Sequence, residues 1–220
     1  MVQVKICGTT SVHDARLALE AGADFVGVIV AHPPSPRNTS IATARLIRDE
    51  APEKSVLLTV NQDEFALIEL ARTLEPAIFQ FHGDESPALV AVLTQRGFRV
   101  WKAIHGDAAQ LHELARKYTD AGAEAVLVDA RESKPDAVIY GGTGKVADWN
   151  GARALVDAGY QVVLAGGLTP ENVERAIQQV HPFAVDCVSG VEATKGIKDP
   201  DRVQNLINNA KGETTSALLG

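Results

Sequence analysis

The sequence predicts an α/β protein formed by a single closed (β/α)8 or TIM barrel. Short apolar runs typical of buried strands recur eight times along the 220 residues, and segments with helical apolar spacing separate them. The average unit is 220/8, or about 27 residues, close to the ~30 residues of a strand–helix–strand repeat. Strands joined through helices pair in parallel, because the chain must cross over to return to the same end of the sheet.

The expected strands are short and apolar. They cover residues 2–6, 25–30, 56–60, 77–81, 99–103, 125–128, 162–165 and 183–185. Apolar residues at i, i+3, i+4 and i+7 predict amphipathic helices, most clearly over 173–180 and 203–210. Three helices are expected to start at a capping side chain followed by proline: Ser86-Pro87, Thr169-Pro170 and Asp199-Pro200.

An open, doubly wound sheet is the competing architecture. Eight units favour closure, and no G-x-G-x-x-G follows the first strand, which disfavours dinucleotide binding. No shift in composition marks a second domain. We therefore expect a catalytic barrel over residues 1–210 and a flexible, polar C-terminal tail over 211–220.

Composition disfavours several classes of protein. The net charge of −7 disfavours nucleic acid as a partner, since that binding depends on basic residues that release counterions. The sequence contains no run of about 18 apolar residues, so we expect no membrane-spanning helix. The N-terminal residues lack a signal-peptide pattern, so we expect a cytoplasmic protein. Two cysteines are too few for a disulfide framework, and no histidine stands at metal-ligand spacing, so we expect no metal and no cofactor.

Polar and glycine residues gather where the expected strands end. In TIM barrels the active site lies at the carboxyl ends of the strands. The residues found there are Cys7-Gly8, Ser35-Pro36-Arg37, Gln80 and His82, Asp129, Gly141-Gly142-Thr143-Gly144, Gly166-Gly167, Asp186 and Ser189-Gly190. Their recurrence in unit after unit predicts an active site at this end.

Three glycine-rich stretches predict a phosphate site. Glycine lets backbone N–H groups approach an anion closely, and loops after the last two strands hold phosphate in many barrels. A helix starting at Thr169-Pro170 would add its positive end. Each stretch alone is explained equally well by a tight turn, but Gly166-Gly167 and Ser189-Gly190 occur together in adjacent units, which favours phosphate. The candidate residues are Gly142, Thr143, Gly144, Gly166, Gly167, Ser189 and Gly190.

Six motifs follow one another along the chain. They are Lys5-Ile6-Cys7-Gly8, Ser35-Pro36-Arg37, Gln80-Phe81-His82-Gly83-Asp84-Glu85, Gly141-Gly142-Thr143-Gly144 with Asp148-Trp149, Leu164-Ala165-Gly166-Gly167-Leu168, and Val185-Asp186 with Ser189-Gly190-Val191-Glu192. In this order they resemble the motifs of the phosphoribosylanthranilate isomerase family of tryptophan biosynthesis. The resemblance extends from residue 2 to about residue 210.

The resemblance implies an aldose–ketose isomerase with a small sugar-phosphate substrate and no cofactor. The reaction is the Amadori rearrangement of N-(5-phosphoribosyl)anthranilate to 1-(2-carboxyphenylamino)-1-deoxyribulose 5-phosphate. One acid must protonate the ring oxygen of the ribose, and one base must remove the proton on C2. Cys7 matches the base of the family, Asp129 matches its acid, and Arg37 matches the residue that pairs with the anthranilate carboxylate.

Cys7 is a workable base if local positive charge lowers the pKa of its thiol. Lys5, on the same face of the strand, could supply that charge or could instead pair with a carboxylate inside the barrel. A lone cysteine is more often a small buried hydrophobe, but the position of Cys7 before Gly8 favours catalysis. Cys187 should point outward, so we expect two free thiols.

Asp129 ends an apolar strand, so it should lie at the barrel mouth, because burying a carboxylate is costly. Its ordinary pKa of about 3.9 is too low for an acid at neutral pH. Burial beside an anionic substrate would raise that pKa. The competing interpretation is an aspartate that caps a helix.

The remaining candidates are substrate contacts. Gln80 and His82 alternate with apolar neighbours and should point into the barrel mouth, as should Asp186. The planar guanidinium of Arg37 suits a carboxylate. A solvated loop arginine and a histidine bonded to the backbone are the competing interpretations.

Three features depart from the family pattern. Val188 precedes Ser189 where a second serine is usual, His32-Pro33-Pro34 precedes Ser35 where a lysine is more familiar, and Lys195 replaces a proline before Gly196. Three alternatives stay open: a related isomerase of another aminosugar phosphate, an epimerase, lyase or synthase barrel, and a non-catalytic phosphate-binding barrel. The sequence leaves monomer and homodimer open.

Overall fold

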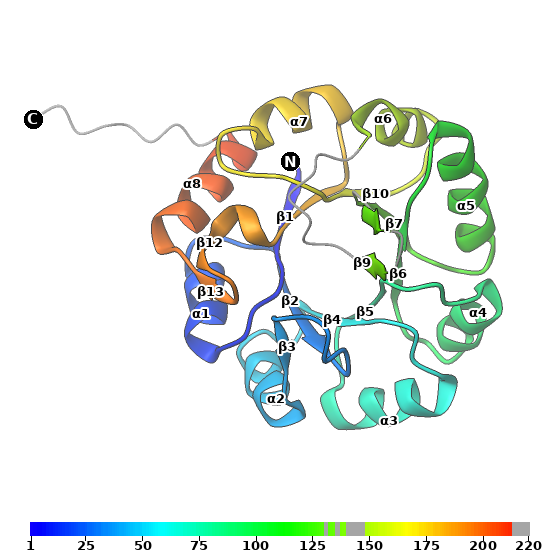
Figure 1. Ribbon diagram of the computed structural model, residues 1–220, viewed down its shortest axis with the longest axis horizontal. Helices are drawn as coiled ribbons and strands as arrows, with labels where there is room; N and C mark the ends of the chain where they lie inside the picture. Colours follow the sequence, from blue (N-terminus) through cyan, green and yellow to red (C-terminus); the bar gives the residue numbers. More distant parts are fainter. Residues whose placement is uncertain (130–131, 135–136, 140–147, 213–220) are drawn as a thin grey trace, which may run out of the picture.

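The computed structural model is a closed barrel of parallel strands ringed by helices (Figure 1). The structure describes residues 1–129, 132–134, 137–139 and 148–212. The barrel strands are β1 (Gln3–Ile6), β2 (Phe25–Val30), β4 (Ser55–Thr59), β5 (Ile78–Phe81), β6 (Val100–Ile104), β7 (Ala125–Val128), β10 (Val162–Leu164) and β11 (Ala184–Cys187). Because β1 pairs with both β11 and β2, the sheet closes on itself. The predicted fold class is confirmed.

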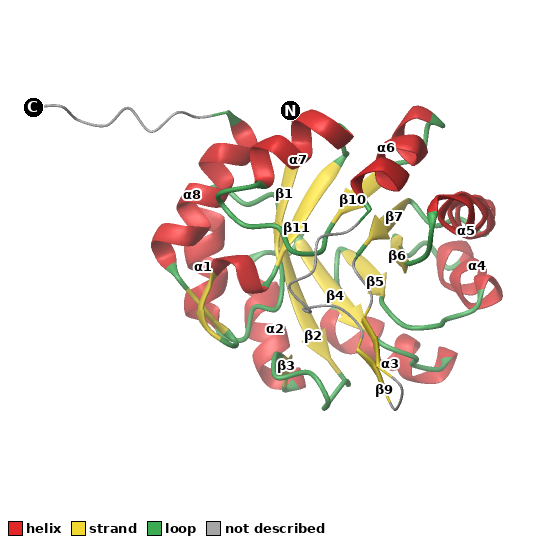
Figure 2. Ribbon diagram, turned by 45° about the horizontal axis from the view of Figure 1, so that its top comes forward, coloured by secondary structure: helices red, strands yellow, loops and turns green. Residues whose placement is uncertain are grey.

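Helices cover the outside of the barrel (Figure 2). They are α1 (Val12–Glu20), α2 (Ile41–Glu50), α3 (Glu64–Leu74), α4 (Pro87–Gln95), α5 (Ala108–Asp120), α6 (Trp149–Asp157), α7 (Val173–Val180) and α8 (Pro200–Lys211). Ser86 caps α4 and Asp199 caps α8, as the sequence predicts. Within the described residues, no helix is both long enough and apolar enough to cross a membrane.

The prediction that a helix starts at Thr169-Pro170 is wrong. The Thr169 carbonyl accepts hydrogen bonds from the N–H groups of Asn172, at 3.2 Å, and Val173, at 3.1 Å. These bonds form a turn, and α7 begins only at Val173. The Asn172 side chain stabilises the turn by accepting from the Thr169 N–H, at 2.9 Å, and donating to the Gly167 carbonyl, at 2.9 Å.

Short strands that the sequence analysis did not expect follow several barrel strands. They are β3 (Asn38–Thr39), β8 (Glu132–Lys134), β9 (Ala137–Ile139), β12 (Glu192–Thr194) and β13 (Ile197–Lys198). β12 and β13 form an antiparallel hairpin after the short 3₁₀ helix Ser189–Val191. The predicted phosphate residues Gly142, Thr143 and Gly144 lie outside the described residues, as does 213–220. α8 extends one residue beyond the expected barrel boundary at residue 210.

Strand alternation separates two apolar layers. Inward side chains, among them Phe25, Ile78, Trp101 and Leu127, fill the barrel, and Phe25 meets Trp101 edge to face with ring centroids 5.0 Å apart. Outward side chains pack beneath the helices. The inner layer closes the barrel interior to water, so polar inward side chains either pair with one another or lie at the carboxyl ends.

Candidate active site

Cys7 follows β1 and is fully buried. Its N–H donates to the Cys187 carbonyl at 2.9 Å, which fixes the backbone where β1 and β11 end. A Cβ on Gly27 of β2 would lie only 2.5 Å from Cys7 Sγ, so glycine is required there. The sequence analysis missed Gly27, although a glycine inside a strand is a known signal of close approach.

Lys5 and Asp186 form a buried ion pair beside Cys7. They are register partners on β1 and β11, and Lys5 Nζ lies 2.9 Å from Asp186 Oδ1. Burial acts to lower the pKa of Lys5, but the charges of Asp186 and Cys7 outweigh it and raise that pKa. The pairing of Lys5 with a carboxylate inside the barrel is therefore confirmed, and Asp186 faces the site as expected.

The environment of Cys7 disfavours its thiolate. Burial raises the pKa of the thiol above 9.0, and the charge of Asp186 raises it further. Lys5 and Lys198 act in the opposite direction but are outweighed. The condition set out from the sequence, a thiol pKa lowered by local positive charge, is not met in net direction, although Lys5 lies beside Cys7 and acts to lower that pKa.

Asp129 directly follows β7 and lies beside the imidazole of His82. Its Oδ2 is 3.3 Å from His82 Nε2, and both side chains are buried. Gln80 Nε2 lies 3.0 Å from His82 Nδ1, and the Asp129 carbonyl lies 3.2 Å from His105 Nδ1. A Gln80 amide that donates to Nδ1 leaves the imidazole proton on Nε2, the nitrogen that lies 3.3 Å from Asp129 Oδ2.

The alternation on β5 and β7 accounts for this cluster. Gln80 and His82 point inward, as predicted, while their neighbours Phe79 and Phe81 belong to the outer layer. Asp129 caps neither flanking helix of the described chain, because Asp107 caps α5 and Asp148 caps α6. The structure thus brings together the predicted acid and two predicted substrate contacts.

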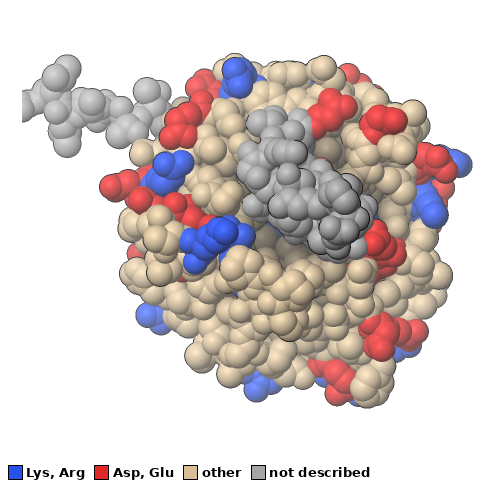
Figure 3. Space-filling model, in the orientation of Figure 1, with Lys and Arg blue, Asp and Glu red and all other residues tan. Residues whose placement is uncertain are grey.

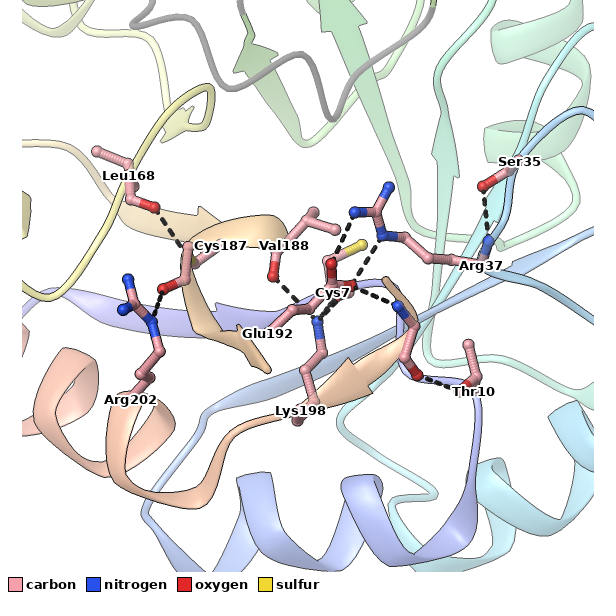
Figure 4. Close-up of polar contacts among 12 residues, drawn as sticks. Cys7, Thr10, Ser35, Arg37, Leu168, Cys187, Val188, Glu192, Lys198 and Arg202 are labelled. Carbon is pink, nitrogen blue, oxygen red and sulfur yellow. Dashed lines mark hydrogen bonds and ion pairs between the residues drawn. The ribbon is translucent and has the colours of Figure 1, made fainter. Parts of the chain in front are cut away.

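Arg37 is buried and paired rather than solvated. Its Nε donates to Glu192 Oε1 at 2.8 Å and its Nη2 to Glu192 Oε2 at 2.7 Å (Figure 4). A Cβ on Gly8 would lie 3.0 Å from Arg37 Cδ, so the arginine stem passes close to the backbone after Cys7. The sequence analysis quoted Glu192 within a motif but gave it no role.

The loops after β10 and β11 meet. Gly166 and Gly167 have φ of +79° and +65°, which favours glycine at both positions. A Cβ on Gly190 would lie 2.0 Å from the Leu168 carbonyl oxygen, so this close approach also needs glycine. The structure therefore places the predicted phosphate residues Gly166, Gly167, Ser189 and Gly190 side by side.

Cys187 points away from the site, as predicted, and both cysteines are free thiols. Its Sγ donates to the Leu168 carbonyl at 3.1 Å, and burial raises its pKa to about 12 from 9.0. This hydrogen bond joins the strand that ends before Ser189 and Gly190 to the loop that follows Gly166 and Gly167.

The ionisation of Cys187 should make the protein less stable in alkaline solution. In the unfolded chain this thiol releases its proton near 9.0, whereas the folded protein keeps it up to about 12. Below the pKa of the unfolded chain this thiol costs the folded state nothing. Between the unfolded and folded pKa values, the free energy of unfolding falls by about 1.4 kcal/mol for each pH unit. Urea unfolding at pH 8 and pH 11 should show a larger loss in wild type than in Cys187→Ala. Equal losses would contradict the assignment.

The face shown in Figure 3 is hollowed near its centre, and Lys and Arg atoms lie beside the hollow. Among the residues that the structure describes, no three His, Cys, Asp or Glu side chains gather to hold a metal ion. A thiol, a carboxylate beside an imidazole, and paired glycine loops lie at the carboxyl ends of one barrel. The fold and the site are typical of a TIM-barrel enzyme that carries out acid–base chemistry on a small anionic molecule.

Comparison with known proteins identifies the family. The model of the family described as N-(5'phosphoribosyl)anthranilate (PRA) isomerase matches residues 4–209. The chain belongs to this family. It is 40% identical over 213 residues to the N-(5'-phosphoribosyl)anthranilate isomerase of Trichlorobacter lovleyi, covering 96% of this chain and 98% of that protein.

Solved structures agree with this assignment. Phosphoribosyl anthranilate isomerase from Thermotoga maritima superposes with a TM-score of 0.84 at 38% identity, covering 96% of this chain and 100% of that chain. A phosphoribosyl anthranilate isomerase in complex with reduced 1-(o-carboxyphenylamino)-1-deoxyribulose 5-phosphate superposes with a TM-score of 0.81 at 34% identity, with the same coverages of 96% and 100%.

Proposed function

We propose that this protein catalyses the Amadori rearrangement of N-(5'-phosphoribosyl)anthranilate to 1-(2-carboxyphenylamino)-1-deoxyribulose 5-phosphate in tryptophan biosynthesis. The observation that carries the proposal is the placement of Cys7 and Asp129 at the carboxyl ends of β1 and β7 in a chain of this family. The relative that holds the reduced product supports the substrate class. As expected from the sequence, we also propose that the protein is cytoplasmic and that it acts as a monomer or a homodimer.

The mechanism needs one proton donor and one proton acceptor. Asp129 gives a proton to the ring oxygen of the ribose, the bond between C1 and that oxygen breaks, and the nitrogen lone pair forms an iminium with C1. The Cys7 thiolate then removes the proton on C2; the C–H electron pair forms the C1–C2 double bond, the C–N π pair returns to nitrogen, and a neutral enolamine results. Protonation of C1 and loss of the hydroxyl proton at C2 complete the ketose, so no net oxidation of the substrate occurs.

Three groups of residues hold the substrate in this scheme. Arg37 uses the N–H groups that Glu192 leaves available to bind the anthranilate carboxylate. Backbone N–H groups of Gly166, Gly167, Ser189 and Gly190 bind the phosphate, together with Gly142, Thr143 and Gly144. Gln80, His82 and Asp186 contact the substrate, although Gln80 is already bonded to His82 and Asp186 to Lys5.

Turnover tests the function directly. N-(5'-phosphoribosyl)anthranilate made in situ is followed by the loss of its anthranilate fluorescence. We expect rapid loss with the wild-type protein and none with the heat-unfolded protein. A folded protein that leaves the fluorescence unchanged would contradict the proposal and favour another aminosugar phosphate, for which the altered loop at His32 is the first place to look.

Replacing Arg37 by Lys should weaken substrate binding more than the chemical step. Lysine keeps the positive charge but loses the planar fork that pairs with two oxygens at once. We expect KM to rise about tenfold or more, as for the loss of one charge-assisted hydrogen bond, with a smaller change in kcat. A fall in kcat at unchanged KM would contradict the carboxylate-binding role.

A further inference from the structure

Lys198, at the end of β13, is a buried ammonium that the mechanism above does not use. Its side chain is 0% exposed, and its Nζ donates to the Cys7 carbonyl at 2.6 Å and to the Val188 carbonyl at 3.1 Å. Glu192 Oε1 lies 3.6 Å from the same nitrogen. Two of the three donors of this ammonium are thus hydrogen-bonded, and the Glu192 carboxylate lies within ion-pair distance.

Each partner of Lys198 belongs to a segment with a proposed functional group (Figure 4). The Cys7 carbonyl is on the residue of the proposed base. Val188 directly precedes the 3₁₀ helix Ser189–Val191, which carries two of the phosphate candidates, Ser189 and Gly190. Glu192 holds Arg37 through two hydrogen bonds. One side chain of a surface hairpin therefore joins the base, the phosphate loop and the carboxylate-binding arginine.

The charges around Cys7 do not balance while its thiol is neutral. Lys5 is paired with Asp186, whereas Arg37 and Lys198 share Glu192. This cluster of five described groups thus has three cations and two anions. Burying an ammonium is costly unless an anion compensates it, and a thiolate at Cys7 would supply the missing negative charge.

We propose that Lys198 is a positioning residue that fixes the backbone of Cys7 and supplies the positive charge against which the Cys7 thiolate forms. This inference rests on the proposed function, in which Cys7 is the base. The charge of Lys198 acts to lower the pKa of Cys7, against the effect of burial, which agrees with the electrostatic role that we propose for Lys198. The pKa of Lys198 itself is lowered, because the effect of burial exceeds the opposite effect of Glu192 and the two cysteines.

The experiment compares Lys198→Met and Lys198→Gln with wild type, with Lys195→Met as the matched control from the exposed turn of the same hairpin. Thiolate absorbance in the ultraviolet is recorded against pH, with tyrosine followed separately. Each protein is also titrated with Cys187→Ala added, so that the thiolate signal is assigned to Cys7; burial raises the pKa of Cys187 to about 12. The pH profile of kcat/KM is measured on the same samples.

In both Lys198 variants the thiolate midpoint and the ascending limb of kcat/KM should move up together by about one pH unit or more. Above the new midpoint, Lys198→Gln should recover more of the wild-type kcat than Lys198→Met, because its amide still donates to the Cys7 carbonyl. Lys195→Met should change neither quantity. Lys198→Gln, which keeps a hydrogen-bond donor, also serves as the test if Lys198→Met does not fold.

A thiolate midpoint that stays at its wild-type pH in a folded Lys198 variant would overturn the inference. The titration needs no substrate, so this failure is distinct from a failure of the proposed function. In that second case the wild-type protein would not turn over the substrate, whatever the midpoint of Cys7.

Discussion

Replacing Cys7 by Ala should lower kcat/KM for N-(5'-phosphoribosyl)anthranilate about 100- to 10,000-fold. Alanine keeps the backbone and fits beside Gly27, where the Cys7 side chain is tightly enclosed. The variant removes the atom that takes the C2 proton and leaves Lys5, Asp186 and Arg37 in place. Steady-state turnover followed by fluorescence measures the effect, and KM should change much less than kcat.

Cys187→Ala is the matched control for this prediction. Cys187 is also a free, buried thiol, but it faces the outer layer and donates to Leu168. Its loss should reduce stability by about 1 kcal/mol for the lost hydrogen bond, while turnover stays within a few fold of wild type. Near-wild-type turnover by a folded Cys7→Ala would show that another group is the base.

Asp129→Asn should be comparably inactive. Asparagine has nearly the same shape and can still lie beside His82, but an amide cannot release a proton to the ring oxygen. We expect kcat to fall about 100- to 10,000-fold, with little change in the free energy of unfolding. The measurement is turnover together with urea unfolding of the same sample.

The control for Asp129→Asn is Asp201→Asn, an exposed aspartate in the first turn of α8. It should leave turnover unchanged, since it lies on a helix outside the barrel. If both variants were equally active, Asp129 would not be the acid, and His82, 3.3 Å from its carboxylate, would be the next candidate.

Much of this site follows from strand periodicity. The two-residue repeat places Gln80 on the inward face of β5 and His82 on the same face just after β5 ends. The end of the apolar run on β7 places Asp129 at the mouth. Register adds Lys5 opposite Asp186. These relations are local or follow from the parallel pairing of strands, so they can be predicted from the sequence.

The contacts that complete the site join residues far apart in the chain. Arg37 pairs with Glu192, and Lys198 binds the carbonyl of Cys7; neither pair shares a strand, a helix or a repeat. The net pKa shift of Cys7 was likewise beyond prediction, because it depends on burial outweighing two nearby lysines. At Thr169-Pro170 a typical helix start was overridden by the side chain of Asn172, which closes a turn first.

The pH dependence of kcat/KM in wild type and Cys7→Asp tests the role of Cys7 most directly. In wild type the pKa of the thiol is raised above 9.0, so the active thiolate increases about tenfold per pH unit up to that pKa, and kcat/KM should rise with it. A carboxylate ionises at far lower pH, so the ascending limb of Cys7→Asp should lie several pH units lower. An ascending limb at the same pH in both proteins would show that a group other than residue 7 is the base.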